Sequence, residues 1–233
     1  MSTPAEELAE LVTTEIAPPS TATITITGLI AITTVLANTR TQALNTIGTL
    51  AHELGHALAA LITGGGVHEI RIHNHSSGVT VGWWTTWLSD LLTTFAGYAA
   101  PPLAGIGVAN LVHDGHAPGV FALITLTTLI TLFYARGIHT WLIVPLLGAG
   151  STAILYWGTP DVQSFTASLI TWLLLVHTPA FLINDVIIAW HHGGLPEGHD
   201  GNQLGPPWPV WFAGWFAVSG WAAVESIPLL YTT

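Results

Sequence analysis

Seven long apolar stretches constrain the fold of this chain more than any other feature of its sequence. They cover residues 21–37, 42–62, 88–112, 118–134, 138–157, 165–190 and 208–230. A helix of about 20 apolar residues is long enough to span the hydrocarbon core of a bilayer. The stretches therefore predict an all-α, polytopic membrane protein of about seven transmembrane helices, with residues 1–233 forming one domain.

Composition supports residence in a lipid bilayer. Only 7% of the 233 residues are charged and the mean hydropathy is +0.59, whereas soluble domains carry about 25% charged residues. The basic residues are three arginines, and the net charge is −10. Because so few cations cannot neutralise phosphates, nucleic-acid binding is excluded. The chain has no cysteine, so a transition-metal site would have to use His, Asp and Glu.

The first 19 residues form an acidic N-terminal segment ahead of the apolar stretches. Thr3, Pro4 and Glu6 have the order of a capped helix start, and Pro18 and Pro19 follow the expected end near Ile16. The segment lacks the basic region that begins a signal peptide. We therefore expect a short acidic helix before the first span.

The sequence His52-Glu53-Leu54-Gly55-His56 lies within the second apolar stretch and fits the pattern H-E-x-x-H. Residues i and i+4 share a face of a helix, so both imidazoles can reach one Zn²⁺ ion, and Glu53 can take a proton from a water molecule. Ionisable groups are costly inside a membrane helix and usually have a function there. The motif therefore predicts a zinc hydrolase site within the membrane.

A third ligand is needed, since catalytic zinc is usually bound by three protein groups and water. Asp185 and Asp200 both fall near the depth and side of the motif in the expected topology. Asp114 and Asp161 fall on the opposite side. Spacing alone leaves Asp185 and Asp200 as alternatives.

The segment after the motif is predicted to be a β-hairpin rather than a helix. Ile70 and Ile72 alternate with polar residues, Val79 and Val81 do the same, and a turn containing Gly78 separates the two runs. Lipid does not tolerate open strand edges, so we expect this hairpin at the interface or against protein. It could be an ordinary interfacial loop, or its edge could accept an extended peptide.

These motifs together resemble the site-2 protease family of intramembrane zinc metalloproteases, in particular its short bacterial and archaeal branch. The resemblance covers roughly residues 48 to 220. It rests on the H-E-x-x-H helix, the hairpin's Ser-Gly-Val-Thr at 77–80, and Ala-Gly-Tyr at 96–98 followed by Pro101. It also rests on an Asp-Gly pair at 200–201 with Gln203-Leu204 and Pro207-Trp208 after it. The chain departs from the family because Asp200 falls in a polar stretch rather than inside a membrane helix.

The resemblance implies a metalloendopeptidase that binds Zn²⁺ through His52, His56 and Asp200, with Glu53 as the catalytic base. It implies a membrane-protein substrate and residence in the bilayer of a prokaryotic cell membrane. Arg71 and Arg136 fall on one side of the expected topology and Arg40 on the other. Because cytoplasmic loops are enriched in basic residues, we expect the N-terminus, the loops near the motif and the active site to face the cytoplasm.

Two other classes of function are compatible with some features. Several histidines lie beside acids in the loops, among them His113, His116, His191 and His192, as in a divalent-metal transporter. A transporter should carry polar ligands on several spans near the middle of the membrane, and few are present here. A catalytically inactive membrane scaffold is the third class, but a scaffold has no need of the glutamate in the motif.

Overall fold

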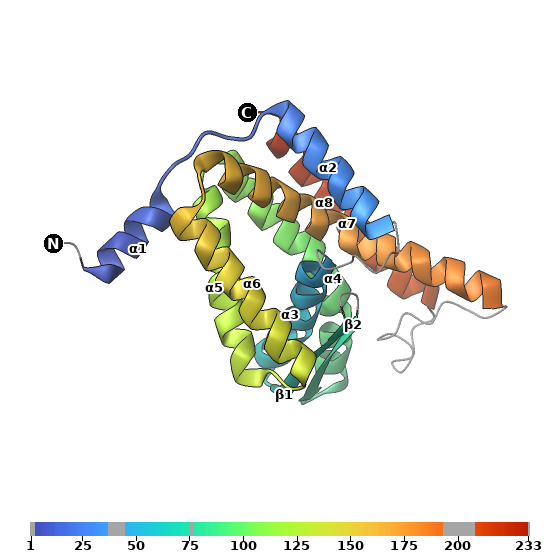
Figure 1. The fold of residues 1–233 in the computed structure, drawn as a ribbon. Coiled ribbons are helices and arrows are strands. Elements are labelled where there is room, and N and C mark those ends of the chain that lie inside the picture. Colours follow the sequence, from blue (N-terminus) through green and yellow to red (C-terminus); the bar gives the residue numbers. More distant parts are fainter. Residues whose placement is uncertain (1–2, 37–44, 75–76, 193–207, 233) are drawn as a thin grey trace.

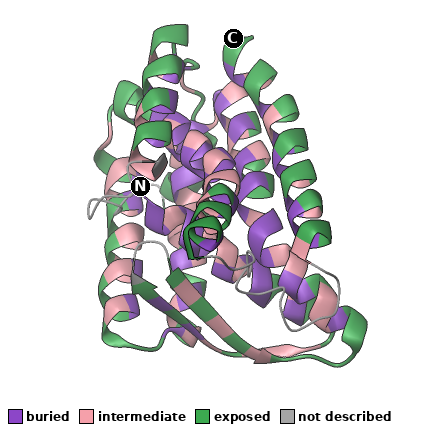
Figure 2. Ribbon diagram, turned by 90° about the vertical axis from the view of Figure 1, so that its right-hand side faces the viewer, coloured by how far each residue is buried: buried purple, intermediate pink, exposed green. Residues whose placement is uncertain are grey.

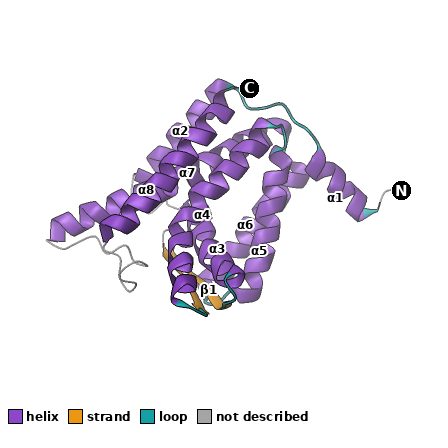
Figure 3. Ribbon diagram, turned by 180° about the vertical axis from the view of Figure 1, so that it is seen from behind, coloured by secondary structure: helices purple, strands orange, loops and turns teal. Residues whose placement is uncertain are grey.

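The computed structural model describes residues 3–36, 45–74, 77–192 and 208–232. The order of elements is α1 (Pro4–Thr13), α2 (Thr21–Leu36), α3 (Thr46–Ile62), β1 (Gly66–Asn74), β2 (Ser77–Trp83), α4 (Trp87–His113), α5 (Ala117–Tyr134), α6 (Ile138–Trp157), α7 (Pro160–His192) and α8 (Trp208–Tyr231) (Figure 1). All seven apolar stretches contain helices, and the strands lie together at one end of the helical bundle (Figure 3). This confirms a mostly helical fold with one small antiparallel hairpin after the motif helix.

Helices α4, α5, α6 and α7 are long and apolar enough to cross a membrane. Exposed residues follow the outer faces of the helices, whereas buried residues face the interior (Figure 2). Many of these exposed residues are large and apolar, such as Phe133, which is 81% exposed, and Ile138, which is 78% exposed. Apolar surface of this extent is rare on soluble monomers and suits contact with lipid.

Two hydrogen bonds show which segments share an end of the bundle. Ile16 N–H donates to Gly115 O at 2.9 Å, and Nδ1 of His113 lies 2.9 Å from Leu229 O. The segment before α2 and the end of α8 therefore both lie beside the α4–α5 turn (Figure 1). The hairpin adjoins the other end of α4. This end is about 40 Å from the α4–α5 turn, because α4 runs from Trp87 to His113 and a helix rises 1.5 Å per residue.

Of the seven expected spans, the four helices α4 to α7 are those long and apolar enough to cross a membrane among the described residues, and the N-terminal segment lies at the α4–α5 end rather than on the hairpin side where it was expected. The difference arises at the start of the chain, where α2 begins at the α4–α5 end and α3 finishes at the hairpin end.

The motif helix ends where the sequence predicts, at a run of glycines. Gly65 N–H donates to Ala60 O at 2.8 Å, Gly64 N–H donates to Leu61 O at 3.2 Å, and Gly64 has a φ of +80°. This is a Schellman arrangement, in which a left-handed residue closes the last turn. The chain then reverses directly into β1, so the hairpin packs against the helix that carries the motif.

Helices α3 and α4 pack closely because small residues face each other. A Cβ atom on Gly55 would lie 2.5 Å from Ala96 O and from Ala100 Cβ. Glycine at this position lets the two backbones approach, as small residues do between membrane helices. The close approach brings the middle of α4 next to the motif.

The N-terminal helix α1 is capped as predicted. Thr3 N–H donates to Glu6 Oε2 at 2.7 Å, and Glu6 N–H donates to Thr3 Oγ1 at 3.3 Å. The hydrogen bonds with Thr3 lower the pKa of the Glu6 carboxyl group below its ordinary value. Helix α1 packs Leu11 and Val12 against the core cluster that contains Phe121.

Candidate active site

The two histidines of the motif share one face of α3. Their Nε2 atoms lie 3.0 Å apart. Two nitrogen ligands of a tetrahedral zinc ion, each about 2.0–2.1 Å from the metal, are separated by about 3.3 Å. His52 and His56 are therefore placed as two ligands of one ion would be.

One hydrogen bond decides which nitrogen of His56 can act as a ligand. Nδ1 of His56 lies 2.7 Å from Thr93 O, and a carbonyl oxygen can only accept, so Nδ1 carries the proton. Nε2 then keeps its lone pair. Because Thr93 belongs to α4 and is 2% exposed, a buried backbone carbonyl of the neighbouring helix orients this histidine, as outer partners commonly do for metal ligands.

Gly97 and Tyr98 on α4 shape the space in front of the histidines. A Cβ atom on Gly97 would collide with Nε2 of His56 and would lie 3.0 Å from Nε2 of His52. The ring of Tyr98 contacts that of His52 edge to face, with centroids 4.5 Å apart. Glycine thus keeps open the space that both ligand atoms face, and Tyr98 supports His52 from the side.

Glu53 is turned toward the hairpin and is 3% exposed. The Thr80 hydroxyl donates to Glu53 Oε2 at 2.7 Å, and a Cβ atom on Gly78 would lie 2.5 Å from Oε1. Strand β2 therefore covers the carboxylate, with Thr80 holding one oxygen and Gly78 leaving room for the other. A carboxylate held beside two convergent imidazoles is placed as a general base should be.

Helix α7 packs on α3 next to the histidine pair. His177 is 3% exposed, and its Nδ1 lies 3.0 Å from Asn45 Oδ1. Its ring also contacts Gly48, where a Cβ atom would collide with Nδ1. Since Gly48 lies one turn before His52 on the same helix face, His177 is next to the site.

Of the two acids that the sequence left as alternatives, only Asp185 lies within the described residues, where it is half-buried. It follows His177 by eight residues and Phe181 by four on α7, and Phe181 contacts Tyr98 with ring centroids 6.1 Å apart. Asp185 is therefore on the α7 face that turns toward the site. Asp200 lies outside the described residues, and within them no three His, Asp or Glu side chains form a group that could hold a metal ion.

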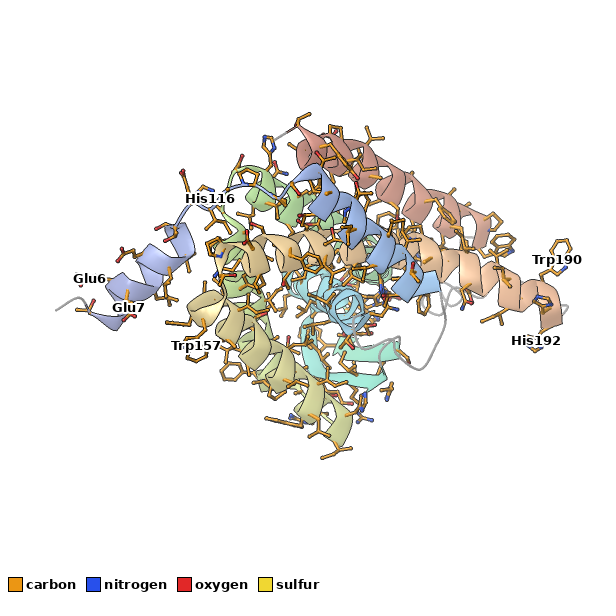
Figure 4. The ribbon with its side chains drawn as sticks, turned by 45° about the horizontal axis from the view of Figure 1, so that its top comes forward. Glu6, Glu7, His116, Trp157, Trp190 and His192 are labelled. Carbon is orange, nitrogen blue, oxygen red and sulfur yellow. The ribbon has the colours of Figure 1, made fainter. Side chains whose placement is uncertain are left out.

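The other histidines do not gather at one place. His116 lies at the α4–α5 turn beside α1, whereas His192 lies at the far end of α7 (Figure 4). Asp114 and Asp161 are both at the α4–α5 end of the bundle, as predicted, because Ser164 near the start of α7 donates to Ala17 O at 3.1 Å. The described loops therefore offer no second cluster of ligands to compete with the motif.

The fold and this site define a class of protein, a helical membrane protein with an H-E-x-x-H helix packed under a β-hairpin. The sequence matches the family described as Peptidase M50B-like over residues 25–228, so the chain belongs to this peptidase family, in agreement with its resemblance to site-2 proteases. No curated protein and no solved structure matches the chain. Together with the four apolar helices, the family identifies an integral membrane protein.

Sequence reasoning missed the residues that orient the motif. The Thr93 carbonyl could not be found from sequence because every residue has one. Thr80 carried a usable signal, because it alternates with Val79 and Val81 and so lies on the inner face of its strand. His177 could also have been found from the sequence, because it is an ionisable residue within an apolar span.

Proposed function

We propose that this protein is a zinc-dependent intramembrane endopeptidase that hydrolyses peptide bonds of membrane-embedded or membrane-proximal segments. One observation carries the proposal. The Nε2 atoms of His52 and His56 converge at 3.0 Å, and the adjacent carboxylate of Glu53 is buried under a hairpin that hydrogen-bonds it. A scaffold would need neither the convergence nor the base.

His52, His56 and Asp200 would hold the ion. The two described members fit it, because His56 has its proton on Nδ1 and therefore offers a lone pair at Nε2. When bound, zinc polarises a carbonyl group and activates water as a nucleophile. Asp185 is the alternative third ligand, since it lies on the α7 face that turns toward the histidines.

Glu53 carries the proton transfers in this mechanism. Its carboxylate takes a proton from the attacking water and gives it to the amide nitrogen that leaves when the peptide bond breaks. The hydrogen bond from Thr80 keeps the carboxylate in one orientation for both transfers. Burial beneath β2 separates the reaction from lipid and from bulk water.

Strand β2 is the proposed docking edge for the substrate. The outer edge of β1 is already used, since Arg136 N–H donates to Ile70 O at 3.0 Å. Within the described residues, β2 pairs only with β1, and it lies directly over Glu53. An extended peptide added to β2 would satisfy its backbone groups within the membrane and bring a peptide bond near the base.

Replacing Glu53 with glutamine tests the proposal. The purified protein and its Glu53→Gln variant would each be reconstituted with a panel of single-span transmembrane reporters. Glutamine keeps the shape but cannot accept the proton, so we expect cleavage by the wild type and at least a hundredfold loss in the variant. Zinc content should remain equal in the two proteins.

Cleavage at the wild-type rate by Glu53→Gln would show that Glu53 is not the base. Zinc uptake into the vesicles by both proteins without cleavage of any reporter would favour a transporter instead. His52→Ala is the matched variant for the metal, and it should lose zinc and activity together.

A further inference from the structure

The hairpin that covers Glu53 is held from behind by the connection between α5 and α6. Ala135 forms a parallel bridge with Ile70, and Arg136 N–H donates to Ile70 O at 3.0 Å. Two residues further along β1, Ile72 N–H donates to Thr140 Oγ1 at 2.9 Å. These contacts occupy the outer edge of β1 at alternate positions.

The hydroxyl of Thr140 both accepts and donates a hydrogen bond. Oγ1 accepts from Ile72 N–H and donates to Arg136 O at 2.7 Å, and the side chain is 0% exposed. The hydroxyl thus ties the first turn of α6 to the strand and to the residue that bonds Ile70. Without it, the buried Ile72 N–H would lose its acceptor, and a buried donor left without an acceptor is unfavourable.

The β1 residues held in this way are the cross-strand partners of the residues that touch Glu53. Ile70 is paired with Thr80, whose hydroxyl donates to Glu53 Oε2, and Ile72 is paired with Gly78, which lies against Glu53 Oε1. A shift of β1 would therefore move both contacts of the carboxylate together. An isolated two-stranded hairpin is only marginally stable, so its position depends on what packs against it.

We propose that Thr140 is a positioning residue for the general base. Its hydroxyl fixes β1, the cross-strand pairs carry that constraint to β2, and β2 sets the orientation of Glu53. This inference rests on the proposed role of Glu53 as the base. It predicts that the hydroxyl of Thr140 affects the chemical step without affecting the metal ligands, because His52 and His56 are oriented by α4 instead.

Three variants of the full-length protein in lipid vesicles test this role. Thr140→Val keeps the shape and removes the hydroxyl, whereas Thr140→Ser keeps the hydroxyl. Thr131→Val is the matched control, since Thr131 is also 0% exposed but its hydroxyl bonds only the carbonyl of Thr127 in its own helix. The measurements are kcat and KM on the reporter that the wild type cleaves, together with zinc content and the temperature of unfolding.

We expect Thr140→Val to lower kcat about tenfold, the effect of one lost hydrogen bond, with zinc content unchanged. Thr140→Ser should recover most of the rate, and Thr131→Val should match the wild type. The proposal is overturned if Thr140→Val keeps the wild-type kcat, if serine fails to restore it, if only KM changes, or if zinc or folded protein is lost in proportion to activity. The Glu53→Gln protein distinguishes a failure of the role proposed for Thr140 from a failure of the role proposed for Glu53. If that protein is inactive while Thr140→Val is normal, only the role of Thr140 fails.

Discussion

At the scale of single residues, each described member of the site is oriented by a partner from another element. His56 is held by the Thr93 carbonyl of α4, His52 contacts the Tyr98 ring, and Glu53 accepts from Thr80 of β2. Positioning by fixed neighbours is what makes a metal ligand or a base effective. Whether the third metal ligand is also oriented by a partner from another element depends on which residue it is.

We expect Asp200→Ala to lower zinc affinity by about 10- to 100-fold or more and to abolish cleavage, because a carboxylate ligand would be lost. Asp185→Asn should retain zinc. The measurement is the zinc content of each purified protein after dialysis against a weak chelator. Retention of zinc by Asp200→Ala together with its loss from Asp185→Asn would assign the ligand to Asp185, on the α7 face that turns toward the site.

At the scale of elements, Pro102 inside α4 requires a partner from α7. Pro102 has no N–H to give to the Tyr98 carbonyl four residues before it, and the Thr178 hydroxyl donates to that oxygen at 2.8 Å. Thr178 is 0% exposed, so no other donor from solvent can replace it. The bond locks α7 to the part of α4 that carries Gly97 and Tyr98.

Thr178→Val should therefore destabilise the protein by about 1–3 kcal/mol, because it leaves a buried carbonyl without a donor. Thr171→Val on the same helix is the control, since Thr171 donates to Ala167 O of its own helix and is equally buried. Thermal unfolding in one detergent would compare the two variants with the wild type. Equal unfolding temperatures for the two variants would contradict the role assigned to Thr178.

The sequence was sufficient to predict local elements, and the reason is that their signals are local. The glycines at 64–66 end α3, the alternation around Ile70 and Val79 gives the hairpin, and the capping box starts α1. Contacts between elements carried no such signal. Neither the bridge from Ile70 to Ala135 nor the hydrogen bond from Thr178 to Tyr98 leaves a pattern along the chain.

At the scale of the whole molecule, the number of passages determines which segments share a side of the membrane. Apolar length alone predicts seven spans, with the N-terminal segment on the same side as the hairpin. The hydrogen bonds of Gly115 and His113 instead place the segment before α2, the α4–α5 turn and the end of α8 at one end of the bundle. The hairpin is at the opposite end, together with Arg71 and Arg136.

Basic residues favour the cytoplasmic side, so we expect the hairpin end in the cytoplasm and the α4–α5 turn outside. The chain has no cysteine, so Ser77→Cys and Asp114→Cys each introduce a single thiol at an exposed position without background. In intact cells, an impermeant maleimide should label Asp114→Cys and spare Ser77→Cys, and both should react after lysis. The reverse pattern would place the active site toward the outside, and labelling of both proteins in intact cells would contradict the separation of the two ends by the bilayer.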